Sequence, residues 1–354
     1  MGPGNNSQAR SSKSTQKGLL DDYTLAVLSL ILYVFAIGIV SVYGLICNVI
    51  NIIVFCKQGF KDTVNITLFG LTISDMGCAI TLFWGSVCFN PLFIEADLPM
   101  VYQDIIYLTS GWPLVCFARI SSWITAFVTF ERCLCITVPL KVKMILTPRR
   151  TVFVVVGIYL GIILCVVPLY YAMGLGPRHF PERNVTIIGS VYNENGPFYE
   201  GVALTLSAFS QLASFFAVII CTGILVHNFL LKSKWRQSAS SATRQEFLTN
   251  RDKKVVKMIL FISSLFIVFF SPTAANTFVM MISSEYRTGG RYQNVYLLNW
   301  AISCLLVGTN STVNIFVYYS MSSKYRKILD EMLKRKEGNR GPSERKAVRC
   351  IQSL

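Results

Sequence analysis

Long apolar stretches alternate with short polar segments along most of this 354-residue chain. Seven stretches hold at most one Asp, Glu, Lys, Arg or His each: 25–56, 64–94, 105–130, 151–177, 201–231, 258–284 and 292–323. About 20 apolar residues suffice to cross a bilayer as an α-helix. Because lipid offers the backbone no hydrogen-bond partner, we expect each stretch to be helical. The pattern predicts an all-α protein with a seven-transmembrane helix bundle.

The flanking segments differ from the apolar stretches. Residues 1–24 are mostly polar and predict a disordered extracellular N-terminus, and the seven-transmembrane domain follows over 25–320. Over 321–334, Tyr325 and Met332 belong to an apolar helical face opposite basic residues, which predicts a short amphipathic cytoplasmic eighth helix. Residues 335–354 are expected to form a disordered cytoplasmic tail.

Composition and charge agree with a membrane protein. Hydrophobic residues make up 53% of the chain and charged residues 14%. Of the 33 Lys and Arg, 25 lie in the connections on the C-terminal side of the bundle, which predicts an extracellular N-terminus and a cytoplasmic C-terminus. The net charge of +15 therefore reflects topology and does not indicate nucleic-acid binding. On this orientation, Asn5 and Asn184 lie in extracellular glycosylation sequons of a plasma-membrane protein.

A carboxyl group lies in the middle of the second stretch. Asp75 can meet Ser121 of the third stretch and a polar face of the seventh. That face consists of Asn310, Ser311 and Asn314. One carboxylate among neutral oxygens predicts a site for a small hard cation such as sodium, whereas a protonated carboxyl kept for packing is the alternative.

A single Arg interrupts the third stretch. Arg119 lies about thirteen residues before Arg132 and so in the outer half of the bilayer. It either makes an internal ion pair or backbone-carbonyl bond, for which Glu200 and Asp104 are the candidate acids, or anchors a ligand with a carboxylate or another acceptor.

The cysteines do not predict a loop disulfide. The chain has eleven, yet the outer loops contain none.

In the sixth stretch, Pro272 breaks the helical hydrogen-bond ladder beside Phe266 and Phe270, which predicts a hinge.

In order and spacing, these residues resemble the motifs of the rhodopsin-like (class A) G-protein-coupled receptors over nearly the whole chain. The matching positions are Asn48, Leu71–Asp75, Glu131-Arg132-Cys133, Pro139-Leu140, Phe266/Phe270/Pro272 and Asn310 to Tyr318. The chain departs from the family where Cys133 replaces Tyr, Phe270 replaces Trp and Ile315 replaces Pro. The family's disulfide to the third helix is missing, because Tyr107 stands at the position of that cysteine. The pattern is most similar to divergent invertebrate receptors of molluscan chemosensory or neuropeptide type.

The resemblance implies a receptor that binds an extracellular ligand, activates a heterotrimeric G protein, and is regulated by a receptor kinase and arrestin. It implies ligand contacts from the outer bundle, namely Arg119, Leu114, Phe270 and Thr273. It also implies a cytoplasmic switch in which Arg132 is held by Glu131 and Asp252, and in which Asn314 and Tyr318 rearrange as the helix swings at Pro272. Apart from an allosteric sodium ion, it implies no cofactor.

Several alternatives narrow the function. The seventh stretch has no Lys, which excludes a retinal-binding opsin, and no acid stands near Leu114 to bind a biogenic amine. Arg119 instead favours an anionic or amidated ligand, either a neuropeptide or a small chemosensory molecule. The only histidines, His179 and His227, form no metal or catalytic cluster, so an enzyme is not indicated. A receptor-like protein that no longer signals and a small-solute transporter remain the alternatives.

Overall fold

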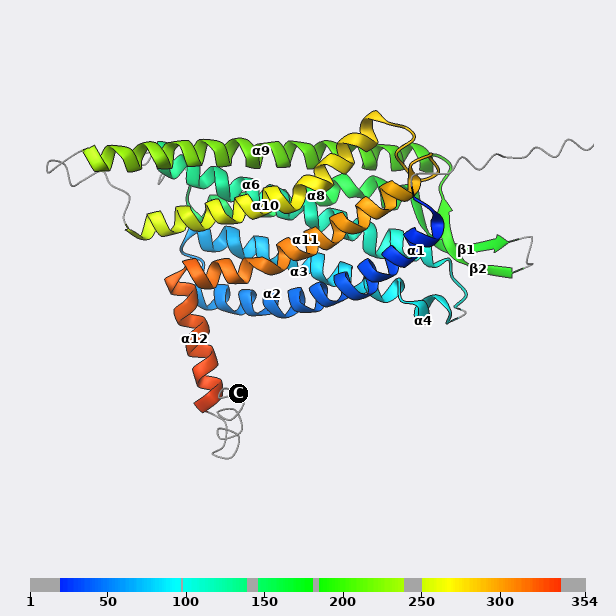
Figure 1. The fold of residues 1–354 in the computed structure, drawn as a ribbon, viewed down its shortest axis with the longest axis horizontal. Helices are drawn as coiled ribbons and strands as arrows, with labels where there is room; N and C mark the ends of the chain where they lie inside the picture. Colours follow the sequence, from blue (N-terminus) through cyan, green and yellow to red (C-terminus); the bar gives the residue numbers. More distant parts are fainter. Residues whose placement is uncertain (1–19, 97, 139–145, 181–184, 239–249, 339–354) are drawn as a thin grey trace, which may run out of the picture.

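The computed structural model describes residues 20–96, 98–138, 146–180, 185–238 and 250–338, with the backbone alone at 180, 232–238, 250–253 and 335–338. Seven long helical segments run side by side as one bundle (Figure 1). They are α1–η1–α2 (Asp22–Leu30, Ile31–Ile37, Gly38–Gln58), α3 (Thr63–Cys88), α5–η2–α6 (Tyr102–Ile106, Tyr107–Gly111, Trp112–Thr137), α8 (Pro148–Ala172), α9 (Gly196–Ser238), α10 (Asn250–Ile282) and α11 (Gln293–Met321). All seven are long and apolar enough to cross a membrane, which confirms the predicted bundle.

The eighth helix, α12 (Ser323–Gly338), follows the end of α11 and points away from the bundle (Figure 1). It starts two residues later than predicted and reaches the limit of the described residues. Tyr325 anchors it: this side chain is fully buried, and its hydroxyl donates to Asn51 Oδ1 at 2.5 Å. The predicted apolar face therefore packs against α2 at Tyr325, and Ile328, Leu329 and Met332 of the same face are partly buried.

One connection contains β-strands that the prediction of an all-α bundle did not include. β1 (Met173–Phe180) and β2 (Val185–Tyr192) form an antiparallel hairpin in which Met173 pairs with Tyr192. The fourth apolar stretch had been extended to residue 177, but α8 ends at Ala172 and the next residue is already extended. Apolar character alone cannot separate a helix end from a strand start, because both bury apolar side chains. A single turn, α4 (Pro91–Ile94), lies at the same end of the bundle.

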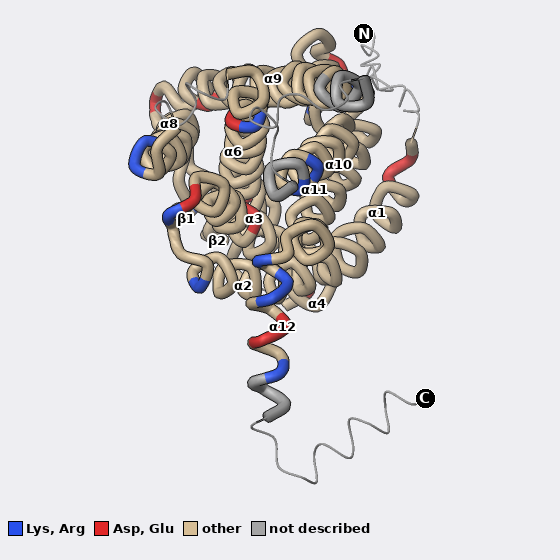
Figure 2. Tube along the Cα trace, turned by 90° about the vertical axis from the view of Figure 1, so that its left-hand side faces the viewer, with Lys and Arg blue, Asp and Glu red and all other residues tan. Residues whose placement is uncertain are grey.

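The core is apolar and the surface of the bundle is apolar as well. Ile120 and Ile124 of α6 are fully buried and lie in the largest buried cluster. Leu164 of α8 and Phe209 of α9, by contrast, are 67% and 60% exposed. Such exposed apolar side chains are expected where a helix faces lipid. The α12 end carries most of the Lys and Arg residues, which mark α8, α10 and α12 in Figure 2. We call the opposite end the hairpin end.

Two segments of the bundle are wound as π-helix, η1 and η2. Pro113 is the second residue after η2 and cannot donate to the carbonyl of Thr109, four residues earlier, so the chain widens there. Both wide segments lie at the hairpin end, where η1 carries Tyr33 and η2 carries Tyr107. This winding places both tyrosines at the cavity described next.

Candidate functional site

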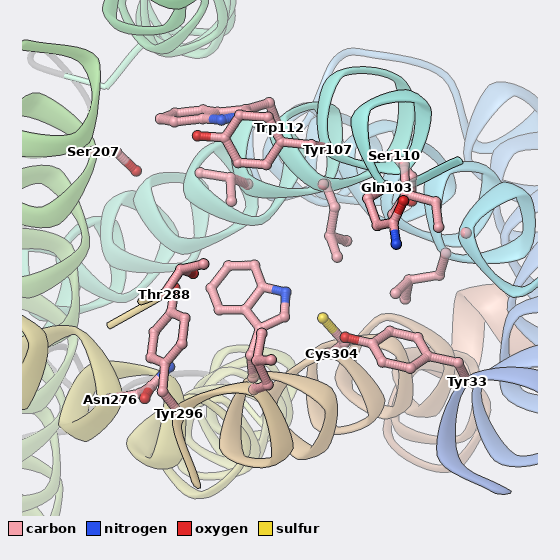
Figure 3. Close-up of a pocket in the computed structure, with 18 of the residues that line it drawn as sticks. Tyr33, Gln103, Tyr107, Ser110, Trp112, Ser207, Asn276, Thr288, Tyr296 and Cys304 are labelled. Carbon is pink, nitrogen blue, oxygen red and sulfur yellow. The ribbon is translucent and has the colours of Figure 1, made fainter. Parts of the chain in front are cut away.

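A cavity of about 300 Å³ opens at the hairpin end between η1, α3, η2, α6, α9, α10 and α11. In Figure 3, Tyr107 and Trp112 lie on one side of this space, and Tyr296 and Tyr33 lie on the other. The walls are mainly apolar, and a few polar groups such as Asn276 and Ser207 point from separate helices (Figure 3). An apolar cavity with few polar groups is typical of a small-molecule or peptide-end binding site.

Arg119 lines this cavity and is only 5% exposed. Its Nε donates to the carbonyl of Ser207 at 3.3 Å, and its Nη1 donates to Oε1 of Gln211. Both partners lie on α9 and neither carries a charge. Of the alternatives that the sequence left open, the backbone-carbonyl bond is present and an internal ion pair is not found among the described residues. A buried guanidinium without a counter-charge is costly, so the site favours a ligand that brings one.

The two acids suggested as partners of Arg119 are engaged elsewhere, and that suggestion was wrong. Asp104 Oδ2 accepts from Ser190 N at 2.8 Å and from Ser190 Oγ at 2.9 Å, and lies 4.0 Å from Arg178 Nη1. The carboxylate thus meets the outer edge of β2. The same edge bonds through Ile188 to Pro99 O and to Val101 N, each at 2.7 Å.

Glu200 makes a second link at the hairpin end. Its two oxygens accept from Tyr107 Oη at 2.7 Å and from Tyr192 Oη at 3.1 Å. Burial, together with the nearby charge of Glu200, raises the pKa of Tyr192 to about 12. Tyr107 occupies the position at which the resembling family has its disulfide cysteine, and the ten cysteines in the described part of the chain are all free. Asp104 and Glu200 therefore hold the hairpin at this end of the bundle, and no disulfide is found in the described part of the chain.

The other predicted ligand residues divide into three groups. Leu114 lines the main cavity together with Arg119. Thr273 lines a second, much smaller cavity directly beside Arg119. Phe270 lines neither; its ring stacks on Phe266 at 4.3 Å between centroids, inside the core. Both rings lie within two turns of Pro272, and α10 bends partway along its length (Figure 1). The geometry favours a packing role for Phe270 at the hinge.

Asp75 lies in the centre of the bundle and is fully buried. Its Oδ1 accepts from Ser121 Oγ at 3.0 Å and its Oδ2 accepts from Asn314 Nδ2 at 2.8 Å, as the sequence analysis predicted. Asn48 extends the network, because its Nδ2 donates to the carbonyl of Ser311 at 3.0 Å. Asn310 is buried on the same helix, and no hydrogen bond of its side chain is found within the described ranges. These are hard oxygen ligands around one carboxylate, a donor set that fits a small cation.

At the α12 end, α6 carries Glu131 and Arg132. Glu131 is fully buried, and its Oε2 accepts from Thr67 Oγ1 at 3.0 Å, a partner on α3 that the sequence did not indicate. Arg132 Nε is buried and has no hydrogen-bond acceptor in the described part of the chain. Asp252 lies on α10, but its side chain is outside the described residues, so its pairing with Arg132 stays a prediction.

Tyr318 lines a cavity of about 310 Å³ at this same end, between α2, α3, α10, α11 and α12. Its side chain is 1% exposed, and its hydroxyl has no hydrogen-bond partner among the residues that the structure describes. Lys254 of α10 and Lys324 of α12 lie at the same cavity. A buried, unpaired hydroxyl next to a space is free to take a new partner when the helices move.

Gln211 and Ser303 line or contact the Arg119 site but were not among the residues predicted from the sequence. Gln211 belongs to a run of polar residues in the fifth apolar stretch, with Ser207, Ser210 and Ser214. Their spacing of three and four residues places them on one helical face, and this periodicity could have identified them. Ser303 is an isolated serine in an apolar stretch, and the sequence contains no signal that would have selected it.

Seven spanning helices, a cavity at the hairpin end and a buried Glu131 beside Arg132 at the other end define a seven-transmembrane receptor. The family model described as serpentine type 7TM GPCR chemoreceptor Srw matches residues 34–336, most of the chain. The chain belongs to this family of G-protein-coupled receptors. The class predicted from the motifs is thereby confirmed.

Similar curated proteins are also receptors. The chain is 24% identical to human lysophosphatidic acid receptor 4 over 297 residues, covering 82% of this chain and 74% of that receptor. It is 22% identical to neuropeptide receptor 22 of Caenorhabditis elegans, covering 84% and 67% of the two chains. It is 24% identical to the FMRFamide receptor of Drosophila melanogaster, covering 82% of this chain and 52% of that receptor. The protein is a multi-pass membrane receptor for an extracellular ligand that couples to a G protein, and it is not an enzyme.

Proposed function

We propose that this receptor lies in the plasma membrane with its hairpin end outside, and that it recognises a ligand with an acidic or amidated group through Arg119. The orientation is supported by the concentration of Lys and Arg at the α12 end (Figure 2). In this orientation Asn5 and Asn184 are glycosylated on the outside; both lie outside the described residues.

One observation carries the ligand proposal. Arg119 is buried in the wall of the cavity, and among the described residues only the neutral oxygens of Ser207 and Gln211 accept its hydrogen bonds. A guanidinium binds carboxylate and phosphate with two parallel hydrogen bonds and also binds amide oxygens. The names of two similar receptors state ligands of these kinds, lysophosphatidic acid and FMRFamide. The apolar walls would hold the rest of the ligand, whether it is a neuropeptide end or a small chemosensory molecule.

Substitution of Arg119 tests this assignment. A library of acidic lipids, small acids and amidated peptides is screened on the wild type with calcium, cyclic AMP and arrestin readouts, and active ligands are then titrated on Arg119→Ala. We expect a potency loss of about 30-fold or more at normal surface expression, because a buried polar anchor contributes about 2 kcal/mol or more. The potency on Arg119→Lys should lie between those on the wild type and on Arg119→Ala, because Lys keeps the charge but lacks the planar guanidinium fork.

Arg291→Ala is the matched control, because Arg291 lies in an exposed turn outside both hairpin-end cavities, with its guanidinium over the ring of Tyr292. It should keep wild-type potency. Normal potency of Arg119→Ala at normal surface expression would refute the anchor.

At the α12 end we propose the switch by which the receptor activates its G protein. Glu131 and Asp252 would hold Arg132 in the inactive state, and Tyr318 would meet Arg132 when α10 swings at Pro272. The unpaired Tyr318 hydroxyl and Arg132 Nε support this proposal, because both can gain a partner. A ligand shifts this equilibrium only by its different affinity for the two states.

Charge reversal of Asp252 tests the switch. Asp252→Lys should raise basal nucleotide exchange on a co-expressed G protein, and Lys257→Glu, a charge reversal on the same helix outside the Tyr318 cavity, should not. Unchanged basal exchange in Asp252→Lys would show that Asp252 does not hold Arg132 and would leave Glu131 as the only proposed restraint on Arg132. A complete lack of ligand-driven exchange in the wild type would favour a receptor that no longer signals.

Two further parts of the proposal concern regulation. We propose that Asp75, Ser121, Asn310, Ser311 and Asn314 hold a sodium ion. Its charge would balance a carboxylate that has no basic partner among the described side chains. We also propose that a receptor kinase and arrestin act on the activated receptor at its cytoplasmic face.

A further inference from the structure

A second cavity of about 20 Å³ lies next to Arg119, deeper in the bundle than the main cavity. The two cavities share Leu114, Val115, Arg119, Trp300 and Cys304 in their linings, so they adjoin each other. The deeper cavity adds Thr273 of α10 and Ser303 of α11 to the wall, and neither of these lines the main cavity. Three helices thus bring one guanidinium and two hydroxyls to one small space.

The two hydroxyls have no partner. Thr273 is 5% exposed and Ser303 is 2% exposed, and neither Oγ has a hydrogen-bond partner among the described residues. Most serine and threonine side chains in these helices bond to a carbonyl of their own helix, as Thr277 does to Thr273 O at 2.9 Å. Buried hydroxyls without a partner are uncommon, and each costs free energy that a ligand oxygen could recover.

The charge of the site selects an anion. Arg119 contributes a positive charge, and neither a carboxylate nor another basic group lines the small cavity. The donors that remain free are the two hydroxyls and the part of the guanidinium that α9 does not engage. The site therefore offers hydrogen-bond donors from several directions together with one uncompensated positive charge, an arrangement that stabilises an oxyanion.

The size of the small cavity limits which anions can bind. One water molecule needs a cavity of about 10–15 Å³, so a cavity of 20 Å³ admits one or two small groups. A planar carboxylate meets this limit and matches the fork of a guanidinium, whereas a tetrahedral phosphate is bulkier. We infer that the small cavity is a carboxylate subsite, which takes a terminal carboxylate of the ligand while the apolar remainder lies in the main cavity. This inference rests on the proposed ligand role of Arg119 and goes beyond it by choosing the acid over the amide and the phosphate.

Matched ligands test the inference. The purified receptor in lipid nanodiscs is titrated with straight-chain monocarboxylic acids of graded length and N-acyl amino acids, with the primary amide of each, and with lysophosphatidic acid. Ligand-induced thermal stabilisation is the readout, because it needs no signalling. We expect acids to raise the melting temperature and to bind at least tenfold more tightly than their amides.

Variants that lack one of the two hydroxyls test whether the ligand's carboxylate binds in the small cavity. Thr273→Val and Ser303→Ala should each weaken binding of the best acid about tenfold, the value for a hydrogen bond to a charged group, while leaving the amide unchanged. Thr309→Val and Ser264→Ala are the matched controls. Their hydroxyls bond to carbonyls of their own helices, at 2.8 Å in each case, and line neither cavity. The control variants should bind the acid as the wild type does.

The outcomes separate this inference from the proposed function. If acids and amides bind equally and Arg119→Ala abolishes both, the anchor stands and the carboxylate subsite is refuted. If lysophosphatidic acid alone binds, or if Thr273→Val and Ser303→Ala leave acid binding unchanged, the subsite is refuted as well. The same holds if no carboxylate stabilises the receptor, in which case the cavity holds water. If Arg119→Ala binds every ligand normally, the proposed function itself fails.

Discussion

The packing of the β1–β2 hairpin at the cavity end of the bundle depends on Asp104, and Asp104→Asn should loosen it. In the structure, one oxygen of this carboxylate accepts two hydrogen bonds from Ser190, at 2.8 and 2.9 Å. The substitution keeps the shape of the side chain but removes its charge. The edge of β2 then loses the charged acceptor that links it to the first turn of the third spanning segment.

The expected magnitude follows from these contacts. A hydrogen bond to a charged group contributes about 1.5–3 kcal/mol and a neutral one about 1 kcal/mol, so two bonds lose about 2 kcal/mol in total. The ion pair with Arg178 adds little, because its atoms are 4.0 Å apart and the Arg178 side chain is 52% exposed. A change of 2 kcal/mol in the opening free energy corresponds to roughly 30-fold faster amide exchange.

Hydrogen exchange measured by mass spectrometry on residues 185–192 is the appropriate assay. Exchange at Ile188 and Ser190 should speed up about 30-fold in Asp104→Asn, by the factor just derived, with unchanged protection in the core of α6. Glu194→Gln removes a charge from the adjacent turn. Glu194 makes no hydrogen bond or ion pair within the described ranges, so this variant should not alter exchange. Equal exchange in Asp104→Asn and the wild type would show that the backbone bonds to Pro99 and Val101 hold the hairpin by themselves.

Two further predictions concern the stability of the bundle. Tyr325→Phe should destabilise the junction of α12 with α2 by about 1 kcal/mol, because it removes the buried bond to Asn51; a lower melting temperature in nanodiscs checks this, and Tyr319→Phe, with its exposed hydroxyl, should change little. Gly77→Val should cost about 1–3 kcal/mol, because a Cβ at this position would clash with the Phe117 ring. Gly157→Ala, where the new Cβ meets nothing within 4 Å, should express normally at the surface, and equal surface expression of the two variants would contradict the predicted clash.

Sequence reasoning was most successful where the physical signal is local. Hydropathy is summed over neighbouring residues, so the seven spans and the eighth helix were predictable without knowledge of contacts. The Asp75 network was predictable in part, because the few polar groups inside an apolar bundle must find one another. The hairpin was missed because the short apolar run from Met173 is compatible with both a helix end and a strand.

The partners of Arg119 illustrate what could not be predicted. Glu200 and Asp104 were reasonable candidates by charge, but the structure gives Arg119 the neutral Gln211 and the carbonyl of Ser207. The choice depends on how α6 and α9 are rotated about their axes, and this rotation is set by packing over the whole length of the helices. The same rotation leaves Asp104 facing Ser190 and Glu200 facing two tyrosines.

By itself, the sequence determined that the protein is a seven-helix membrane receptor and that a buried Arg needs an acceptor. It also predicted the orientation in the membrane. These conclusions follow from hydropathy, charge and motif spacing, which do not depend on distances between helices. Only the tertiary structure decided that Thr273 and Ser303 share a cavity with Arg119, and that two carboxylates hold the hairpin in place of a disulfide. The reason is that these groups lie on separate elements, and only the packing of the helices brings them together.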